Sequence, residues 1–101
     1  MKIAICGSGN SVDKEVSKKA FEIGSGLAKS DVLILTGACN GHPYEAAKGA
    51  FSNGGKVIGI SPAKSKEEHV ENYKFPIDVF TEIEYTGLGI PARNFPLVKE
   101  A

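Results

Sequence analysis

The chain has 101 residues, with twelve basic and twelve acidic side chains and no net charge. This length allows one small domain, and the balanced charge argues against a basic surface that binds nucleic acid. The apolar runs are too short to span a membrane or to form the core of a signal peptide.

Three short apolar runs, at 2–6, 32–36 and 56–60, predict strands that are covered on both faces. Between the first two, apolar residues recur at a spacing of three or four, which predicts an amphipathic helix. Its expected buried face consists of Val12, Val16, Ala20, Ile23 and Leu27. Gly24 and Gly26 either weaken its last turns or let it approach the sheet closely.

A second helix is expected between the second and third strands. Pro43 suits its first turn, and Gly54-Gly55 suits its end. Its expected packed face is made mostly of small residues, namely Tyr44, Ala46, Ala47, Ala50 and Phe51.

The second half of the chain is less regular. Residues 61–76 are polar and predict a loop with a helical turn, whereas residues 78–86 can form a fourth strand. Period-two alternation places Glu82 and Glu84 on a solvated face, so the buried part is expected at 79–81. A last helix follows after residue 87. The order strand, helix, strand, helix, strand, strand, helix predicts an α/β fold with a doubly wound parallel sheet.

The first strand leads into the turn Gly7-Ser8-Gly9-Asn10. Val12 stands where a dinucleotide fingerprint needs its third glycine, and no acidic residue ends the second strand. No Gly-Lys-Ser or Gly-Lys-Thr is present, so a nucleoside-triphosphate loop is excluded as well.

Two successive strands nevertheless end in glycine-rich turns, at 7–10 and 37–41. In a parallel sheet both turns lie at the carboxyl edge, where backbone amides at helix starts can bind a phosphate. Ser8 could add its hydroxyl, although this residue and the glycines could also serve only to shape the turns. His42 could contact a ligand or simply cap the following helix.

Arg93 is the only arginine of the chain. Its planar guanidinium suits a two-point contact with a phosphate or carboxylate, and Asn94 offers a polar neighbour. The alternative role for Arg93 is a surface ion pair.

No metal site is predicted, because two cysteines and two histidines at loose spacing provide too few ligands. Cys6 and Cys39 are expected to be free thiols in a reducing cytoplasm.

The stretch TGACNGHPYEAAKGAFSNGGKVIGISPA, at 36–63, resembles the second strand–helix–strand unit of Rossmann-like proteins related to LOG. These proteins were once described as lysine decarboxylase-like, and they include molybdenum cofactor carriers. ICGSGN is similar to the family's first strand and turn, and TGLGIPARNFPLVKEA to its Arg-containing helix. The resemblance implies one Rossmann-like nucleotide-binding domain over residues 1–101. It also implies that Gly37 and Gly41 flank an anion-binding turn and that Arg93 binds the substrate and takes part in catalysis.

The resembling enzymes continue with a strand and a P-G-G-x-G-T-x-x-E motif, whereas this sequence stops at Ala101. The chain is therefore either a fragment or an unusually short member of the family. We expect a domain that is incomplete at its C-terminus and a chain that is inactive alone. The related reaction would hydrolyse a nucleoside 5′-monophosphate to a free base and ribose 5-phosphate. The alternatives are a non-catalytic carrier of a molybdopterin-type ligand and, disfavoured by the neutral charge, a DNA-processing protein. The resemblance further implies a homodimer, and no cofactor is expected to be required. The short apolar runs predict no contact with a membrane.

Overall fold

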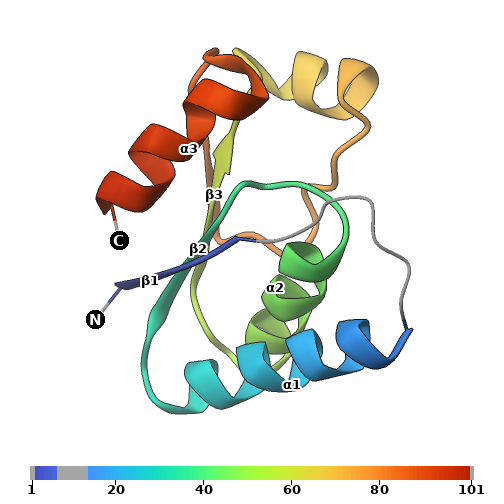
Figure 1. Ribbon diagram of the computed structural model, residues 1–101, viewed down its shortest axis with the longest axis vertical. Coiled ribbons are helices and arrows are strands. Elements are labelled where there is room, and N and C mark those ends of the chain that lie inside the picture. The colour runs from blue at the N-terminus through green and yellow to red at the C-terminus, as the bar shows by residue number, and fades with distance from the viewer. Residues whose placement is uncertain (1, 7–13, 101) are drawn as a thin grey trace.

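The computed structural model describes residues 2–6 and 14–100. Within this part, four parallel strands form one sheet whose spatial order follows the chain, β1-β2-β3-β4. The strands are β1 (Lys2–Ile5), β2 (Leu33–Thr36), β3 (Val57–Ser61) and β4 (Glu82–Tyr85). The helices are α1 (Lys14–Lys29), α2 (His42–Ser52), α3 (Gly89–Glu100) and a short π-helix at Glu68–Asn72. Helices α1 and α2 lie on one face of the sheet and α3 on the other, so the predicted doubly wound, Rossmann-like α/β fold is confirmed (Figure 1).

Alternation along the strands divides the core between the two faces of the sheet. Ile34 and Val57 are fully buried against α2, in a cluster that includes Ala47 and Ala50. On the opposite face, Leu35 and Ile60 pack against Leu97 of α3, in a second cluster. Because successive side chains of a strand point to opposite faces, neighbouring residues of β2 belong to different clusters.

The two helices on the first face approach each other through two glycines. A Cβ placed on Gly24 would lie 2.7 Å from the carbonyl carbon of Ala46, and one on Gly49 would lie 2.8 Å from that of Phe21. Each helix therefore packs its glycine against the backbone of the other. The close approach predicted for Gly24 exists, but it is made to α2 rather than to the sheet.

Three apolar residues assigned to packed faces are exposed instead. The exposed fraction is 42% for Val16, 58% for Ile23 and 45% for Phe51. The small residues at the α1–α2 contact bring the backbones together, and the larger side chains are left at the rim.

The polar segment predicted as a loop contains the π-helix and the fully buried His69. Glu82 and Glu84 are exposed on β4, as the alternation predicted. Of the residues expected to be buried before them, Val79 is buried but Thr81 is exposed.

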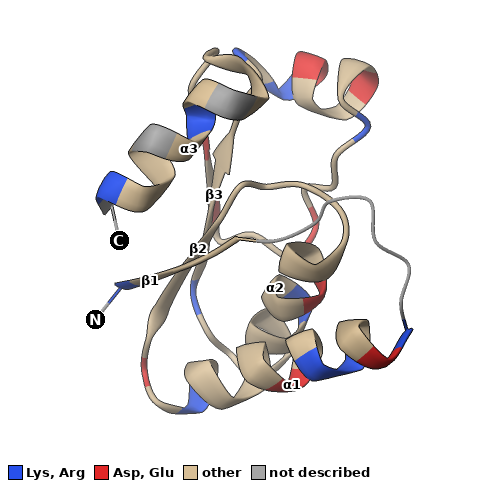
Figure 2. Ribbon diagram, viewed as in Figure 1, with Lys and Arg blue, Asp and Glu red and all other residues tan. Residues whose placement is uncertain are grey.

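Charged residues of both signs are interspersed along α1 and α2 (Figure 2). None of the helices in the described part of the chain is long and apolar enough to cross a membrane.

Candidate ligand-binding site

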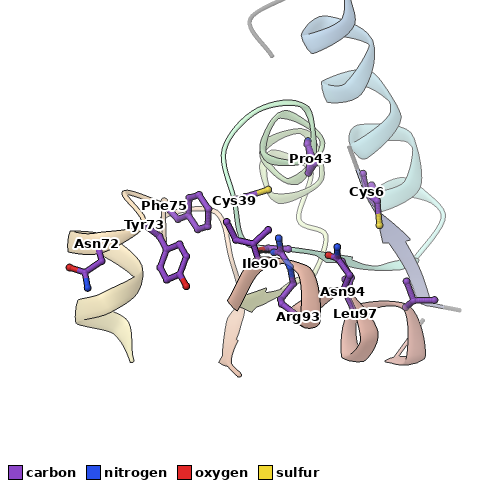
Figure 3. A pocket seen from close by; sticks show the side chains of 13 residues that line it. Cys6, Cys39, Pro43, Asn72, Tyr73, Phe75, Ile90, Arg93, Asn94 and Leu97 are labelled. Carbon is purple, nitrogen blue, oxygen red and sulfur yellow. Dashed lines mark hydrogen bonds between the residues drawn. The ribbon is translucent and has the colours of Figure 1, made fainter. Parts of the chain in front are cut away.

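An open cavity of about 650 Å³ lies at the carboxyl ends of β1 and β2. The register pairs Ile5 with Thr36, so the residues that follow, Cys6 and Gly37, reach this edge together. Helix α3, the segment from Asn72 to Phe75, and the residues Cys39 and Pro43 around the start of α2 supply the remaining walls (Figure 3). The polar or sulfur-containing side chains that line the cavity come from Cys6, Cys39, Asn72, Tyr73, Arg93 and Asn94. The other lining residues are Ile5, Gly37, Pro43, Phe75, Ile90, Leu97 and Val98.

Arg93 lies in the wall of this cavity and is only 5% exposed. Its Nη1 donates hydrogen bonds to the carbonyl oxygens of Gly37 and Ile60, the latter at 3.3 Å. Its Nε is buried and has no hydrogen-bond partner in the described part of the chain. The surface ion pair considered from the sequence is therefore wrong, because the guanidinium is buried against the ends of β2 and β3.

Gly37 is required next to this guanidinium. A Cβ at Gly37 would lie 3.0 Å from Nη2 of Arg93 and closer still to the rest of the group. Any larger residue at this position would displace Arg93. The glycine predicted to form a turn thus also creates the space that the arginine fills.

The electrostatics of the cavity favour an anion. Arg93 is the only charged residue among the described residues that line it, and its hydrogen bonds go to neutral carbonyl groups. A buried charge without a counter-ion is costly. An anionic ligand would offset that cost.

Both cysteines carry free thiols, as predicted. Cys39 is buried, and this burial raises the pKa of its thiol, although the positive charge of Arg93 opposes the shift. Cys6 is exposed. The two thiols therefore line one cavity with different accessibility.

The structure brings only part of the predicted site together. Gly37, Arg93 and Asn94 line the cavity. Gly41 and His42 begin α2 instead and are not among the residues that line it. Gly41 has a φ of 82°, a conformation that suits glycine, and the Nε2 of His42 is buried without a partner in the described part of the chain. The predicted phosphate ligands at 7–10 lie outside the described residues.

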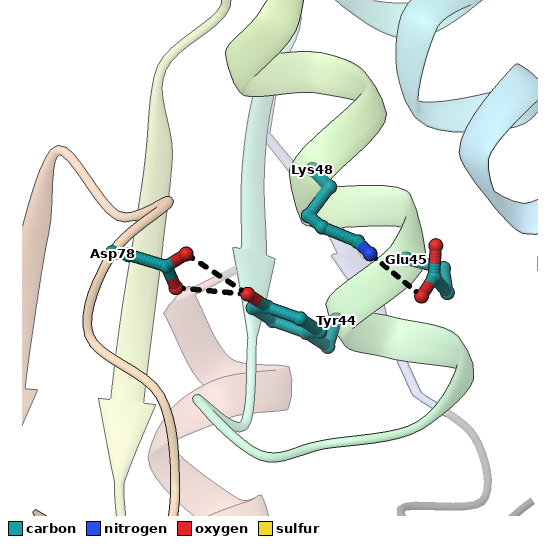
Figure 4. Close-up of polar contacts among 4 residues, drawn as sticks. All are labelled: Tyr44, Glu45, Lys48 and Asp78. Carbon is teal, nitrogen blue, oxygen red and sulfur yellow. Dashed lines mark hydrogen bonds and ion pairs between the residues drawn. The ribbon is translucent and has the colours of Figure 1, made fainter.

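On another side of α2, Tyr44 joins the helix to the segment before β4. Its hydroxyl donates to both carboxylate oxygens of Asp78, at 2.9 and 3.0 Å (Figure 4). Burial and this hydrogen bond raise the pKa of Tyr44 to about 12. Glu45 pairs with Lys48 at 2.9 Å on the same helix. None of these four residues lines the cavity, so their contacts stabilise the fold and are not part of the candidate site.

Sequence reasoning did not assign the cysteines or the aromatic residues to the site. Cys6 could have been placed there because it directly follows a strand that ends at the carboxyl edge. Tyr73 and Phe75 offered a weaker signal, namely two aromatic residues in an otherwise polar stretch. In the described residues, no group of three or more His, Cys, Asp or Glu side chains could hold a metal ion.

A parallel sheet with helices on both faces and a cavity at its carboxyl edge defines a Rossmann-like ligand-binding domain. The chain belongs to the SLOG cluster4 family, whose model matches residues 1–101. The predicted resemblance to LOG-like and molybdenum cofactor carrier proteins is thereby confirmed.

Two solved structures show the same fold over most of this chain. The molybdenum cofactor binding protein of the phototrophic bacterium Rippkaea orientalis is 31% identical, with a TM-score of 0.84, over 99% of this chain and 57% of its own. The Moco carrier protein of Chlamydomonas rheinhardtii is 29% identical, with a TM-score of 0.69, over 89% and 50%. An uncharacterized protein of Archaeoglobus fulgidus is 34% identical over 64 residues, which are 63% of this chain and 42% of that protein. The chain thus spans about half the length of the proteins it matches.

Proposed function

We propose that this protein binds a small phosphate-bearing ligand, a nucleotide or a molybdopterin-type compound, in the cavity beside Arg93. The observation that carries this proposal is the buried guanidinium, whose Nε has no partner among the described residues and whose charge no lining residue of that part neutralises. Similarity to a molybdenum cofactor binding protein and to a Moco carrier protein supports a molybdopterin-type ligand.

Among the two roles left open by the sequence, we favour binding without catalysis. Cleavage of an N-glycosidic bond needs a group that stabilises positive charge developing on the sugar. No carboxylate is present among the described residues that line the cavity. The chain is therefore expected to bind AMP without releasing adenine, and chromatographic detection of free adenine would contradict this expectation.

Calorimetric titration of AMP and of a phosphorylated pterin into the wild-type chain and an Arg93→Met variant tests the binding site. We expect Arg93→Met to weaken binding at least about tenfold, which corresponds to about 1.4 kcal/mol. Lys99→Met is the matched control, because Lys99 is exposed on the same helix and does not line the cavity. An Arg93→Lys variant, which keeps a donor for the carbonyl groups, provides a second comparison if the methionine variant is poorly folded. Equal affinity of all four proteins would refute the proposed site.

The homodimer and the cytoplasmic location remain predictions. Size-exclusion chromatography with light scattering tests the first of them, and a mass of one chain would contradict it.

A further inference from the structure

The cavity has an aromatic wall, formed by Tyr73 and Phe75, that the proposed phosphate site does not use. The two rings are stacked, with centroids 5.5 Å apart and an interplanar angle of 29°. In the view of Figure 3 they lie on one side of Ile90, and Arg93 lies on the other. The cavity therefore has a cationic end and an aromatic end.

The aromatic wall is held in place by the buried His69. The imidazole Nε2 donates to the carbonyl oxygen of Pro76 at 2.9 Å, since a carbonyl oxygen can only accept. In the neutral ring, Nδ1 then accepts from the hydroxyl of Ser61 at 2.7 Å. Phe75 contacts the imidazole edge-on at 5.6 Å, and its amide donates to the carbonyl oxygen of His69 at 3.1 Å.

A further hydrogen bond joins this segment to the loop between β2 and α2. The side-chain amide of Asn40 donates to the carbonyl oxygen of Lys74, between the two aromatic residues, at 3.2 Å. The wall is thus fixed before a ligand arrives, and such preorganisation reduces the entropy lost on binding.

We infer that Tyr73 stacks on the planar ring of a ligand whose anionic group lies against Arg93. Tyr73 lines the cavity and stacks with Phe75, so a planar ring of the ligand would extend this aromatic pair. Flat heterocycles stack on aromatic side chains whatever their edge pattern. The ligand class is therefore an anionic aromatic heterocycle, such as a nucleoside monophosphate or a pterin phosphate, rather than a sugar phosphate. This inference rests on the proposed function for the position of the anionic group only.

Three probes separate the ring from the phosphate. AMP carries both groups, adenosine carries the ring alone, and ribose 5-phosphate carries the phosphate alone. Binding of each is measured by calorimetry or competition with the wild-type protein, Tyr73→Leu, Tyr73→Phe and Arg93→Met, after circular dichroism has verified folding. Leucine keeps apolar volume at the wall and removes the aromatic face, whereas phenylalanine keeps that face.

We expect Tyr73→Leu to weaken the binding of AMP and of adenosine about tenfold or more. The same variant should weaken the binding of ribose 5-phosphate less than about twofold. Tyr73→Phe should restore binding of AMP to within about threefold of wild type. Equal effects of Tyr73→Leu on all three probes, or no effect on AMP, would overturn the stacking role. If Arg93→Met leaves AMP and ribose 5-phosphate unchanged while adenosine still responds to Tyr73→Leu, the proposed phosphate site fails and the aromatic wall stands. Failure of every probe to bind the wild-type protein would overturn both.

Discussion

Gly24→Ala is expected to destabilise the protein, although alanine is the better helix former. The added methyl carbon would overlap the carbonyl oxygen of Ala46 and lie 2.7 Å from its carbonyl carbon, so α1 and α2 would have to move apart by at least about 1 Å to reach normal contact. Overpacking of this kind costs up to about 3 kcal/mol, because backbone cannot rotate out of the way as a side chain can. The gain in helix propensity returns about 1 kcal/mol. We therefore expect the free energy of unfolding to fall by about 2 kcal/mol.

Gly26→Ala in the same helix is the matched control. Apart from its chain neighbours and the nearby backbone of its own helix, a Cβ at Gly26 would meet no described atom within 4 Å. Only the propensity gain therefore applies, and the free energy of unfolding should rise by about 1 kcal/mol. Urea unfolding followed by far-ultraviolet circular dichroism measures both variants against wild type. The reasoning is refuted if Gly24→Ala proves as stable as Gly26→Ala.

Three further predictions concern buried groups. His69→Ala should lower the free energy of unfolding by about 3 kcal/mol, because it removes a fully buried ring with two hydrogen bonds; an unchanged urea midpoint would contradict this. The phenol of Tyr44 should titrate with a pKa of about 12, and ultraviolet titration of the Asp78→Asn variant should give a lower pKa for this residue. The same titration curve for wild type and Asp78→Asn would exclude a contribution from Asp78. Iodoacetamide should modify Cys6 faster than Cys39, because Cys39 is buried and its pKa is raised. Bound AMP should slow both reactions, and equal rates by mass spectrometry would argue against the burial of Cys39.

The sheet could be predicted from sequence because its strands are covered on both faces. Ile34 and Leu35 must both be apolar, since one packs toward α2 and the other toward α3, and this requirement produces a continuous apolar run. Helix α2 was predictable from Pro43 at its start. The exposure of Phe51 was not, because helical spacing alone does not show which turn faces a partner.

The site was harder to predict, because its contacts join distant segments. Gly37 was assigned to a turn, but the reason that it must be glycine is the guanidinium of Arg93, 56 residues away. Tyr73 lies in a segment that has no regular apolar pattern and is held by the hydrogen bonds of His69 and Asn40. Local periodicity carries no information on such contacts.

The hydrogen bonds of Arg93 to the ends of two strands make the cavity depend on how firmly α3 is docked. On the face that it covers, α3 contributes the fully buried Leu97 and the guanidinium, while α1 and α2 hold each other on the opposite face. Local opening of α3 would therefore dismantle the ligand site and leave the other layer intact. Ligand affinity and the protection of α3 amides from solvent exchange are then two measures of the same equilibrium, and each should rise with the other.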